Sequence, residues 1–249
     1  MYQSFAGVYD ALMAQVDYAA WAAHNDALMQ HCGVKKGAKC VECACGTGSL
    51  TLPLKKRGYQ MTGVDLSEEM IARAMERARK EGLLIPFIRQ DMCLLQLPRK
   101  TECILATCDG VNYLTKPEKV QQFFVAAFAA LKPGGALIFD VSSAYKLENT
   151  LGNNTLTCDE EDFAYIWHNR FDGEKALVHM ALSIFHKRPD GAFDRIEETQ
   201  TQRAHTLEEL TLGLHKAGFE NVQAFGNMRM TQARQNDERL HICALKPLA

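Results

Sequence analysis

The stretch VECACGTG at residues 41–48 lies between a short apolar run that starts at Lys39 and a helical pattern that starts at Leu50. Glycines at positions 46 and 48 let a ligand approach the backbone closely, where a Cβ atom would obstruct it. A strand that turns into a helix at such a bend also directs the first N–H groups of the helix towards the ligand. We therefore predict a strand–turn–helix unit that binds a small molecule at this bend.

The alternation of strand and helix continues along the chain. Short apolar runs predict strands, and the helix after Ser67 is expected to bury Ile71, Ala74, Met75 and Ala78 on one face. A helix over 118–131 is expected to end at the KPGG turn, residues 132–135. The pattern is typical of a doubly wound α/β fold with a mostly parallel, seven-stranded sheet. The strands predicted for this sheet are 39–44, 60–65, 85–90, 103–108, 136–141, 221–225 and 240–245.

Acidic residues belong to three neighbouring predicted strands: Glu42, Asp65 and Asp91. Ligands of open α/β sheets bind at the carboxyl ends of the strands, and a carboxylate placed like Asp65 suits the hydroxyls of a ribose. A GxGxxG dinucleotide motif is absent, because residues 44 and 49 are Ala and Ser. Three acids also disfavour an anionic pyrophosphate. The pattern favours a ligand with an amine, a ribose and a positive charge, as in S-adenosylmethionine (SAM).

Five stretches, in this order along the chain, resemble the motifs of class I SAM-dependent methyltransferases. They are ECACGTG (42–48), GVDLSEEM (63–70), RQDM (89–92), CDGVNYL (108–114) and LKPGG (131–135). The resemblance covers residues 37–142 and about the last 45 residues, and it departs from the family at Ala44, where glycine is usual. It implies a Rossmann-like methyltransferase fold, SAM as cofactor, and transfer of a methyl group to a nitrogen or oxygen of a small molecule.

The resemblance also implies which residues surround the methionine end of SAM. Glu42 is expected to anchor the amino group, directly or through water, with the backbone of residues 45–48 beside it. Cys108 is expected to lie behind the sulfonium. An N-terminal helix resembles a segment that covers SAM in small-molecule members of the family. Its candidate contacts are Tyr9, Tyr18 and Trp21.

For the nucleoside, the resemblance implies that Asp65 holds the ribose and that Leu66 packs on the adenine. Asp91 and Met92 are expected to bind the adenine edge. The complete set of expected cofactor-binding residues is Glu42, Ala44, Cys45, Gly46, Thr47, Gly48, Asp65, Leu66, Met70, Asp91, Met92, Cys108, Tyr9, Tyr18 and Trp21.

The pattern changes after about residue 150. Alternating apolar residues, with hairpin turns at DG (172–173) and PDG (189–191), predict an insertion of about three antiparallel strands. We expect residues 1–36 to form a helical lid, 37–149 and 206–249 the SAM-binding core, and 150–205 an antiparallel β cap on the substrate side. The residues expected to contact the acceptor are Asn112, Tyr145 and Trp167. Asp109 and Tyr113 are candidates for a catalytic base, which is needed only if the acceptor must lose a proton.

Composition restricts the partners of the chain. A net charge of −2 over 249 residues gives no strong field for nucleic acid or an acidic membrane surface. Neither a secretory leader pattern nor a stretch as long as a membrane span is present, so we expect a cytoplasmic protein. The odd number of cysteines, nine, and their apolar settings predict reduced core thiols. Cys40 and Cys43 would point to opposite faces of a strand, so no metal site is expected.

Three other functions remain open at this point. The chain could methylate protein or RNA, could bind SAM without catalysis, or could be an NAD-dependent oxidoreductase. RNA binding would require a basic, aromatic face, and the glycine pattern disfavours the oxidoreductase. No motif identifies the acceptor or an oligomeric state.

Overall fold

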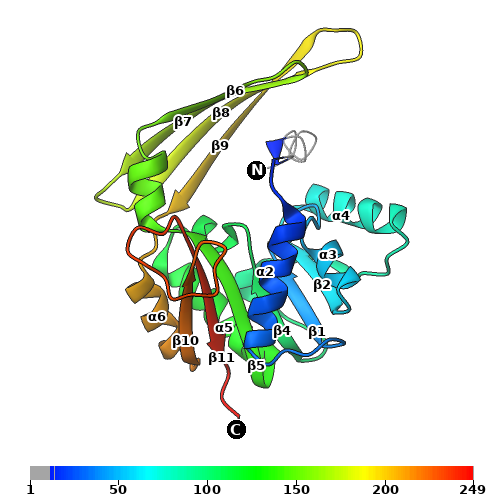
Figure 1. Cartoon of the computed structure of the whole chain (residues 1–249), viewed down its shortest axis with the longest axis vertical. Coiled ribbons are helices and arrows are strands. Elements are labelled where there is room, and N and C mark those ends of the chain that lie inside the picture. The colour runs from blue at the N-terminus through cyan, green and yellow to red at the C-terminus, as the bar shows by residue number, and fades with distance from the viewer. Residues whose placement is uncertain (1–11, 14, 249) are drawn as a thin grey trace.

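The computed structural model describes residues 12, 13 and 15–248 and contains the predicted seven-stranded sheet (Figure 1). Its strand order is β10-β11-β5-β4-β1-β2-β3. The five strands from β3 to β5 run parallel; β11 is antiparallel to β5, and β10 pairs antiparallel with β11 and so has the same direction as the parallel strands. The strands are β1 (Lys39–Cys43), β2 (Gln60–Asp65), β3 (Phe87–Arg89), β4 (Thr101–Ala106), β5 (Leu131–Ser142), β10 (Glu220–Gly226) and β11 (Arg239–Leu245). The predicted fold class is therefore confirmed.

Helices cover both faces of this sheet, so the central strands are buried on two sides, as expected for parallel strands, whereas the edge strands β3 and β10 are more exposed. Leu28 of α2 and Leu54 of α3 belong to the hydrophobic cluster on one face, whereas Phe124 of α5 and Leu214 of α6 belong to the cluster on the other. The helices are α2 (Tyr18–His31), α3 (Thr51–Lys56), α4 (Glu68–Lys80), α5 (Pro117–Ala130) and α6 (Leu207–Lys216). Short turns of helix are η1 (Met92–Leu94), η2 (Gly110–Tyr113) and η3 (Lys146–Leu151).

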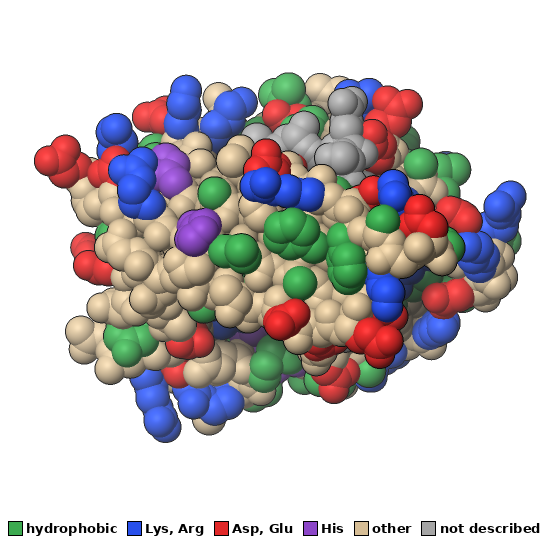
Figure 2. Space-filling model, turned by 90° about the horizontal axis from the view of Figure 1, so that it is seen from above, with side chains coloured by type: hydrophobic (Ala, Val, Ile, Leu, Met, Phe, Trp, Pro, Cys, Tyr) green, Lys and Arg blue, Asp and Glu red, His purple; other side chains and the backbone are tan. Residues whose placement is uncertain are grey.

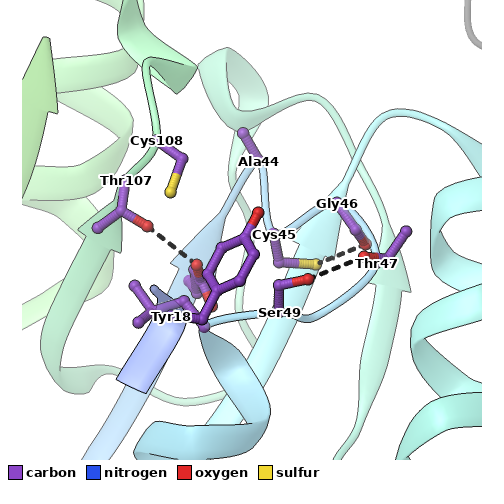
Figure 3. A pocket seen from close by; sticks show the side chains of 10 residues that line it. Tyr18, Ala44, Cys45, Gly46, Thr47, Ser49, Thr107 and Cys108 are labelled. Atoms are coloured by element: carbon purple, nitrogen blue, oxygen red, sulfur yellow. Dashed lines mark hydrogen bonds between the residues drawn. The ribbon is translucent and has the colours of Figure 1, made fainter. Parts of the chain in front are cut away.

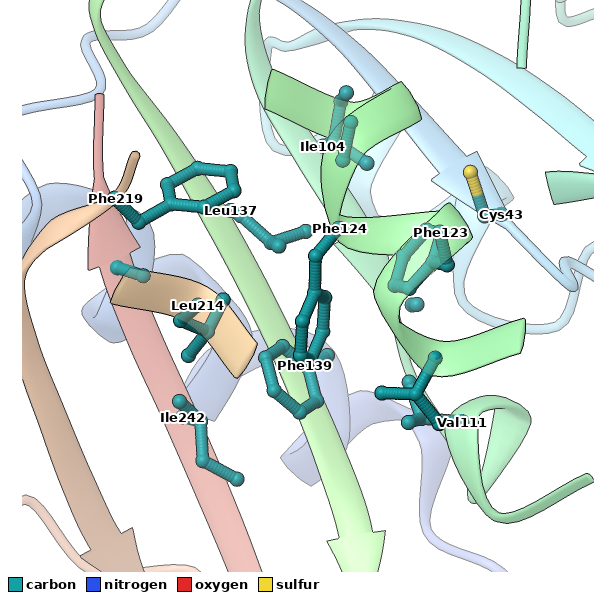
Figure 4. Close-up of a cluster of buried hydrophobic side chains, with 14 of the residues drawn as sticks. Cys43, Ile104, Val111, Phe123, Phe124, Leu137, Phe139, Leu214, Phe219 and Ile242 are labelled. Atoms are coloured by element: carbon teal, nitrogen blue, oxygen red, sulfur yellow. The ribbon is translucent and has the colours of Figure 1, made fainter. Parts of the chain in front are cut away.

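The larger cluster lies between the sheet and α5 with α6 (Figure 4). Phe123, Phe124 and Phe139 are completely buried there, with ring centroids 5.5–5.8 Å apart along the row. Cys43 belongs to this cluster and Cys40 to the opposite one. The two thiols of the CxxC spacing therefore lie on opposite faces of β1, as the strand period predicted.

A second sheet stands above the carboxyl edge of the first (Figure 1). It has four antiparallel strands in sequence order: β6 (Thr155–Asp159), β7 (Phe163–Asp172), β8 (Leu177–Lys187) and β9 (Phe193–Arg203). The insertion was predicted with about three strands, and β6 is the addition. Its sequence TLTCD lies at a sheet edge and alternates between exposed and half-buried residues, but it holds only two apolar residues, Leu156 and Cys158, which is too short a pattern to identify a strand.

Three local predictions are corrected by the structure. Met75 was expected on the buried face of α4, but its side chain is 55% exposed, because Met70 and Ile71 fill that face. The helix ends before residues 132–135, as predicted, but the fifth strand starts at Leu131 rather than at Ala136 and includes these residues, with an irregular register against β4. The third strand covers only Phe87–Arg89 rather than 85–90. Within the described ranges, no helix is both long enough and apolar enough to cross a membrane.

Candidate functional site

The glycine-bearing bend, residues 44–48, follows β1 at the carboxyl edge of the large sheet. Ala44 and Gly46 both have φ of +53°, and Gly48 has φ of +78°. A Cβ on Gly48 would lie 2.8 Å from Leu52 Cδ1, so both the backbone and the packing require glycine there. Ala44 adopts the left-handed conformation in spite of its Cβ, at a cost of about 1 kcal/mol. Alanine at this position therefore preserves the bend.

The bend forms one wall of a small recess of about 40 Å³ (Figure 3). Seven of the predicted cofactor residues line it, together with three that were not predicted. The lining residues are Tyr18, Glu42, Ala44, Cys45, Gly46, Thr47, Ser49, Leu50, Thr107 and Cys108. A space of this size accommodates the end group of a ligand, such as an ammonium group. A nucleoside attached to that group would extend outside the recess, along the strand ends towards β2.

Glu42 is the most deeply buried acid of the recess, with 2% of its surface exposed. Its carboxylate accepts hydrogen bonds from the Thr51 and Thr107 hydroxyls, the second at 3.0 Å. Burial raises the pKa of Glu42 to about 7, against the lowering effect of the two hydroxyls, and the charges of Asp65 and Asp140 raise it further. No salt bridge joins Glu42 to another described residue. The recess therefore gains from a positively charged ligand.

Asp65 ends β2 beside the bend. Its Oδ2 accepts from the Gly46 N–H at 2.8 Å and its Oδ1 from the Ser67 N–H at 2.9 Å. Burial raises the pKa of Asp65, although these backbone hydrogen bonds favour the ionised form. A carboxylate has about four acceptor positions, so two remain for ligand hydroxyls. Leu66 follows with 66% of its surface exposed, which suits a residue that packs on a flat ring.

The other predicted nucleoside contacts divide into two groups. Asp91 lies two residues after the end of β3 and caps η1 by accepting from the Cys93 N–H at 2.8 Å, while Met92 is half buried against the main core. Both lie at the same edge of the sheet as Asp65. Met70, in contrast, is 3% exposed within α4 and does not line the recess. The structure gives Met70 a packing position and not the ligand contact that was expected.

The chain makes a second tight bend after β4. Cys108 and Asp109 have φ of +55° and +67°, two consecutive left-handed residues that are not glycine. The buried Asp140 carboxylate stabilises this bend by accepting from the Cys108 N–H at 2.7 Å and from the Asp109 N–H at 3.3 Å. Backbone strain of this kind costs about 1–3 kcal/mol for each residue and is common at functional sites. The bend places Cys108 on the wall of the recess.

Arg239, at the start of β11, neutralises the acids of this second bend. Its guanidinium pairs with Asp109 at 2.6 Å and with Asp140. Burial opposes ionisation of both acids. At Asp109 the charge and hydrogen bonds of Arg239, together with the charge of Lys146, outweigh burial and lower the pKa of the carboxyl, whereas burial raises the pKa of Asp140 to about 6. Asp109 was predicted as a catalytic base, but a carboxylate with a lowered pKa that is held by arginine is a weak base.

A wider groove of about 380 Å³ adjoins the recess, and Cys108 lines both. Trp21 of α2 and Arg239 form part of its wall, with the guanidinium 4.9 Å from the centre of the indole ring. Of the predicted lid residues, Tyr18 therefore lines the recess and Trp21 the groove. Tyr9 lies outside the described residues.

The four remaining predicted residues lie between core and cap. Asn112 is completely buried, and its amide bonds to the backbone of Ser142 and Arg203, so it ties β5 to β9 rather than facing a ligand. The Tyr113 hydroxyl donates to Gln200 of the cap at 2.7 Å. Tyr145 is 37% exposed at the junction before η3. Trp167 lies in the cap sheet against its hydrophobic cluster.

Sequence patterns did not reveal several residues that shape the site. Arg77 of α4 donates to the hydroxyls of Thr47 and Ser49 at 3.0 and 2.7 Å and fixes the glycine bend. The Thr107 hydroxyl likewise donates to Glu42, and the Arg239 guanidinium donates to Asp109. The helical periodicity placed Arg77 in α4, but nothing local indicates that it reaches a loop 28–30 residues away.

Comparisons with known proteins agree with this geometry. A family model described as a methyltransferase domain matches residues 40–135. YqeM of Bacillus subtilis (strain 168), whose name assigns it to the methyltransferases, is 32% identical over 99% of this chain and 97% of its own. The crystal structure of a SAM-dependent methyltransferase from Clostridium acetobutylicum superposes with a TM-score of 0.89 at 29% identity, covering 99% of both chains. The sugar N-methyltransferase KedS8 from Streptoalloteichus has the same fold, with a TM-score of 0.77 at 19% identity over 96% of this chain and 93% of its own.

Proposed function

Because the chain belongs to the class I SAM-dependent methyltransferases, we propose that its methyl acceptor is a small molecule held between the core and the cap. The acceptor atom in this proposal is a nitrogen or an oxygen. The protein is a SAM-dependent methyltransferase.

The recess supports this proposal through its unbalanced charge. Burial raises the pKa values of Glu42 and Asp65, and neither carboxyl forms a salt bridge with a described residue. Buried carboxylates without a cation are destabilising unless a ligand supplies the charge. The ammonium and sulfonium groups of SAM supply that charge, so the residues present fit the cofactor.

We assign the cofactor's parts as follows. Glu42 faces the ammonium group in the recess, with Tyr18 covering it. Asp65 accepts from the ribose hydroxyls, Leu66 covers the adenine, and Asp91 with Met92 bounds its edge. When bound, SAM would supply a methyl carbon for attack by the acceptor's lone pair, and its sulfur would leave as a neutral thioether. Cys108, on the wall of the recess, would help to hold the methionine end of the cofactor.

The task of the chain in this reaction is alignment and exclusion of water. A sulfonium is a good leaving group, so holding the two reactants in line can supply several kcal/mol of the barrier without a charged catalytic side chain. The cap sheet stands above the same strand ends and is tied to the core by Asn112 and Tyr113. Tyr113 is the better of the two predicted base candidates, because Asp109 is held by Arg239.

A small acceptor agrees with two further observations. Acidic and basic side chains are interspersed on the face seen from above, and no continuous basic patch for RNA is visible there (Figure 2). KedS8, which has a similar fold, is named as a sugar N-methyltransferase. All nine cysteines lie within the described residues and are free thiols, which supports a reducing, cytoplasmic location.

Calorimetric titration of SAM, S-adenosylhomocysteine and NADH tests the cofactor assignment. We expect both sulfur compounds to bind and NADH not to bind. Asp65→Ala should weaken SAM binding about 10- to 100-fold, because it removes hydrogen bonds to a charged group. Asp159→Asn, at the exposed end of β6, is the matched control and should bind SAM like the wild type. Absence of heat with both sulfur compounds, or unchanged affinity in Asp65→Ala, would contradict the assignment.

A further inference from the structure

Alternate residues of β7, β8 and β9 form the side of the cap that looks towards the core, here named the cap face. The Tyr113 hydroxyl, from η2 of the core, donates to Gln200 on this face at 2.7 Å, so the face is joined to the bend that carries Cys108. Cross-strand pairing arranges its central residues in two rows, Trp167–Leu182–Glu198 and Asn169–Met180–Gln200.

Three polar atoms on the cap face are buried and have no hydrogen-bond partner among the described residues. They are the indole Nε1 of Trp167, the amide Oδ1 of Asn169 and the carboxylate Oε1 of Glu198. Asn169 is 7% exposed, and its Nδ2, in contrast to its Oδ1, has a partner, because it donates to the Asn154 carbonyl at 3.1 Å. Native proteins leave few buried polar atoms unpaired, because each such atom carries a desolvation penalty. Three of them on one face indicate a ligand that pairs with them.

The spacing of these groups defines the shape of that ligand. Trp167 and Glu198 lie on either side of Leu182 and are two strand spacings apart, about 10 Å between their backbones. Leu182 and Met180 are 4% and 3% exposed and form an apolar strip between the polar groups. A ring lying on this strip would have the polar groups of Trp167 and Glu198 at its two sides.

Glu198 distinguishes among such ligands. It forms no salt bridge with a described residue, whereas its neighbour Glu197 on the opposite side of the sheet pairs with Arg195 at 2.5 Å. Burial raises the pKa of Glu198. Among ligand groups, a positively charged donor or an N–H donor would therefore form the most favourable hydrogen bond with its carboxylate.

We infer that the cap face binds the methyl acceptor and that this acceptor is a ring compound carrying an amino group, which Glu198 recognises. The inference rests on the proposed function, since it specifies the acceptor of the same site. Leu182 and Met180 contact the ring, Glu198 accepts from its amino group, and Trp167 and Asn169 bond to groups on its other side. Glu198 is a specificity-determining residue in this arrangement, and no proton transfer is assigned to it.

Benzylamine and cyclohexylamine, compared with benzyl alcohol and cyclohexanol, are suitable probes. Binding to the full-length protein saturated with S-adenosylhomocysteine is followed by ligand-observed NMR at millimolar concentrations. Turnover of the same compounds with SAM is followed by formation of S-adenosylhomocysteine. The variant is Glu198→Gln, which is nearly isosteric, and the matched control is Glu197→Gln.

We expect the wild type to bind at least one of the amines more tightly than the corresponding alcohol. Glu198→Gln should weaken binding of that amine at least about tenfold, with SAM affinity unchanged, and Glu197→Gln should behave like the wild type. The inference is overturned if neither amine binds, if the alcohols bind as well as the amines, or if the two variants lose affinity equally. Loss of SAM binding itself would instead count against the proposed function, so the two failures are distinguishable.

Discussion

Replacing Glu42 by glutamine should make the ligand-free protein more stable and the SAM complex weaker. Glu42 is buried between the Thr51 and Thr107 hydroxyls, and its pKa rises from 4.5 to about 7 on folding. Glutamine has nearly the same shape. Its amide oxygen can accept from one hydroxyl and its amide nitrogen can donate to the other, so both threonines keep a partner.

The magnitude follows from the pKa shift. A difference of about 2.5 pKa units corresponds to about 3 kcal/mol. The folded protein retains the proton that the unfolded chain loses above its lower pKa. The free energy of unfolding of the wild type therefore falls as the pH rises through the interval from 4.5 to about 7. Glu42→Gln carries no proton to lose, so we expect it to match the wild type at the acid end and to exceed it by up to about 3 kcal/mol above neutrality.

Cofactor binding should respond in the opposite direction. A cationic ligand favours the ionised form of Glu42, so the affinity of the wild type for SAM should increase as that form becomes populated. Between about pH 6 and about pH 7.5, where most α-amino groups are still protonated, the ionised fraction of Glu42 rises roughly eightfold for a pKa near 7. We expect a similar gain in wild-type affinity and a much smaller one in Glu42→Gln.

Urea unfolding and calorimetry at these pH values measure both effects. S-adenosylhomocysteine, which keeps the ammonium group but lacks the sulfonium charge, locates the contact. If Glu42 faces the ammonium group, the variant loses affinity equally for the two ligands, whereas a contact with the sulfonium affects SAM alone. The reasoning is refuted if Glu42→Gln is less stable than the wild type above neutrality and the affinity of the wild type for SAM does not change with pH.

Two further substitutions test the bends that carry the site. Arg239→Leu leaves Asp109 and Asp140 without their cation. We expect the free energy of unfolding, measured by urea unfolding, to fall by about 3–5 kcal/mol. If this loss does not increase as the pH rises, it is not electrostatic. Gly48→Ala should lower both the melting temperature and SAM affinity, because its Cβ would lie 2.8 Å from Leu52. The control is Gly33→Ala, which has the same φ of +78° and nothing within 4 Å. Equal losses in the two alanine variants would mean that φ alone determines the cost.

Local sequence patterns were sufficient for the parts of the site that depend on where a strand ends. Glu42 and Asp65 reach the ligand edge because they occupy fixed positions in or after parallel strands, and the glycines of the bend require a backbone that few other residues adopt. The fold class could be predicted for the same reason, since alternating strands and helices have few ways to form a parallel sheet.

Residues whose role depends on distant partners could not be assigned in this way. Asn112 stands in a polar loop next to a strand end, which made it resemble a ligand contact. Its amide is instead fully used by the backbone of Ser142 and Arg203, 30 and 91 residues away. Arg239 meets Asp109 across 130 residues. Helical and strand periodicities carry no information about such pairings, so a polar residue held by the fold and one aimed at a ligand have the same local signature.

The acids at the strand ends show how the structure separates these two cases. Asp109 and Asp140 receive a guanidinium from β11, and their charge stabilises a strained bend. At the same edge Glu42 is buried and Asp65 half-buried, yet the described donors that reach them are hydroxyl and backbone groups, and burial raises both pKa values. Hydrogen bonds of this kind orient a carboxylate but do not neutralise it. The fold therefore supplies a cation to Asp109 and Asp140, whereas the charge of Glu42 and Asp65 would be balanced by a cationic ligand.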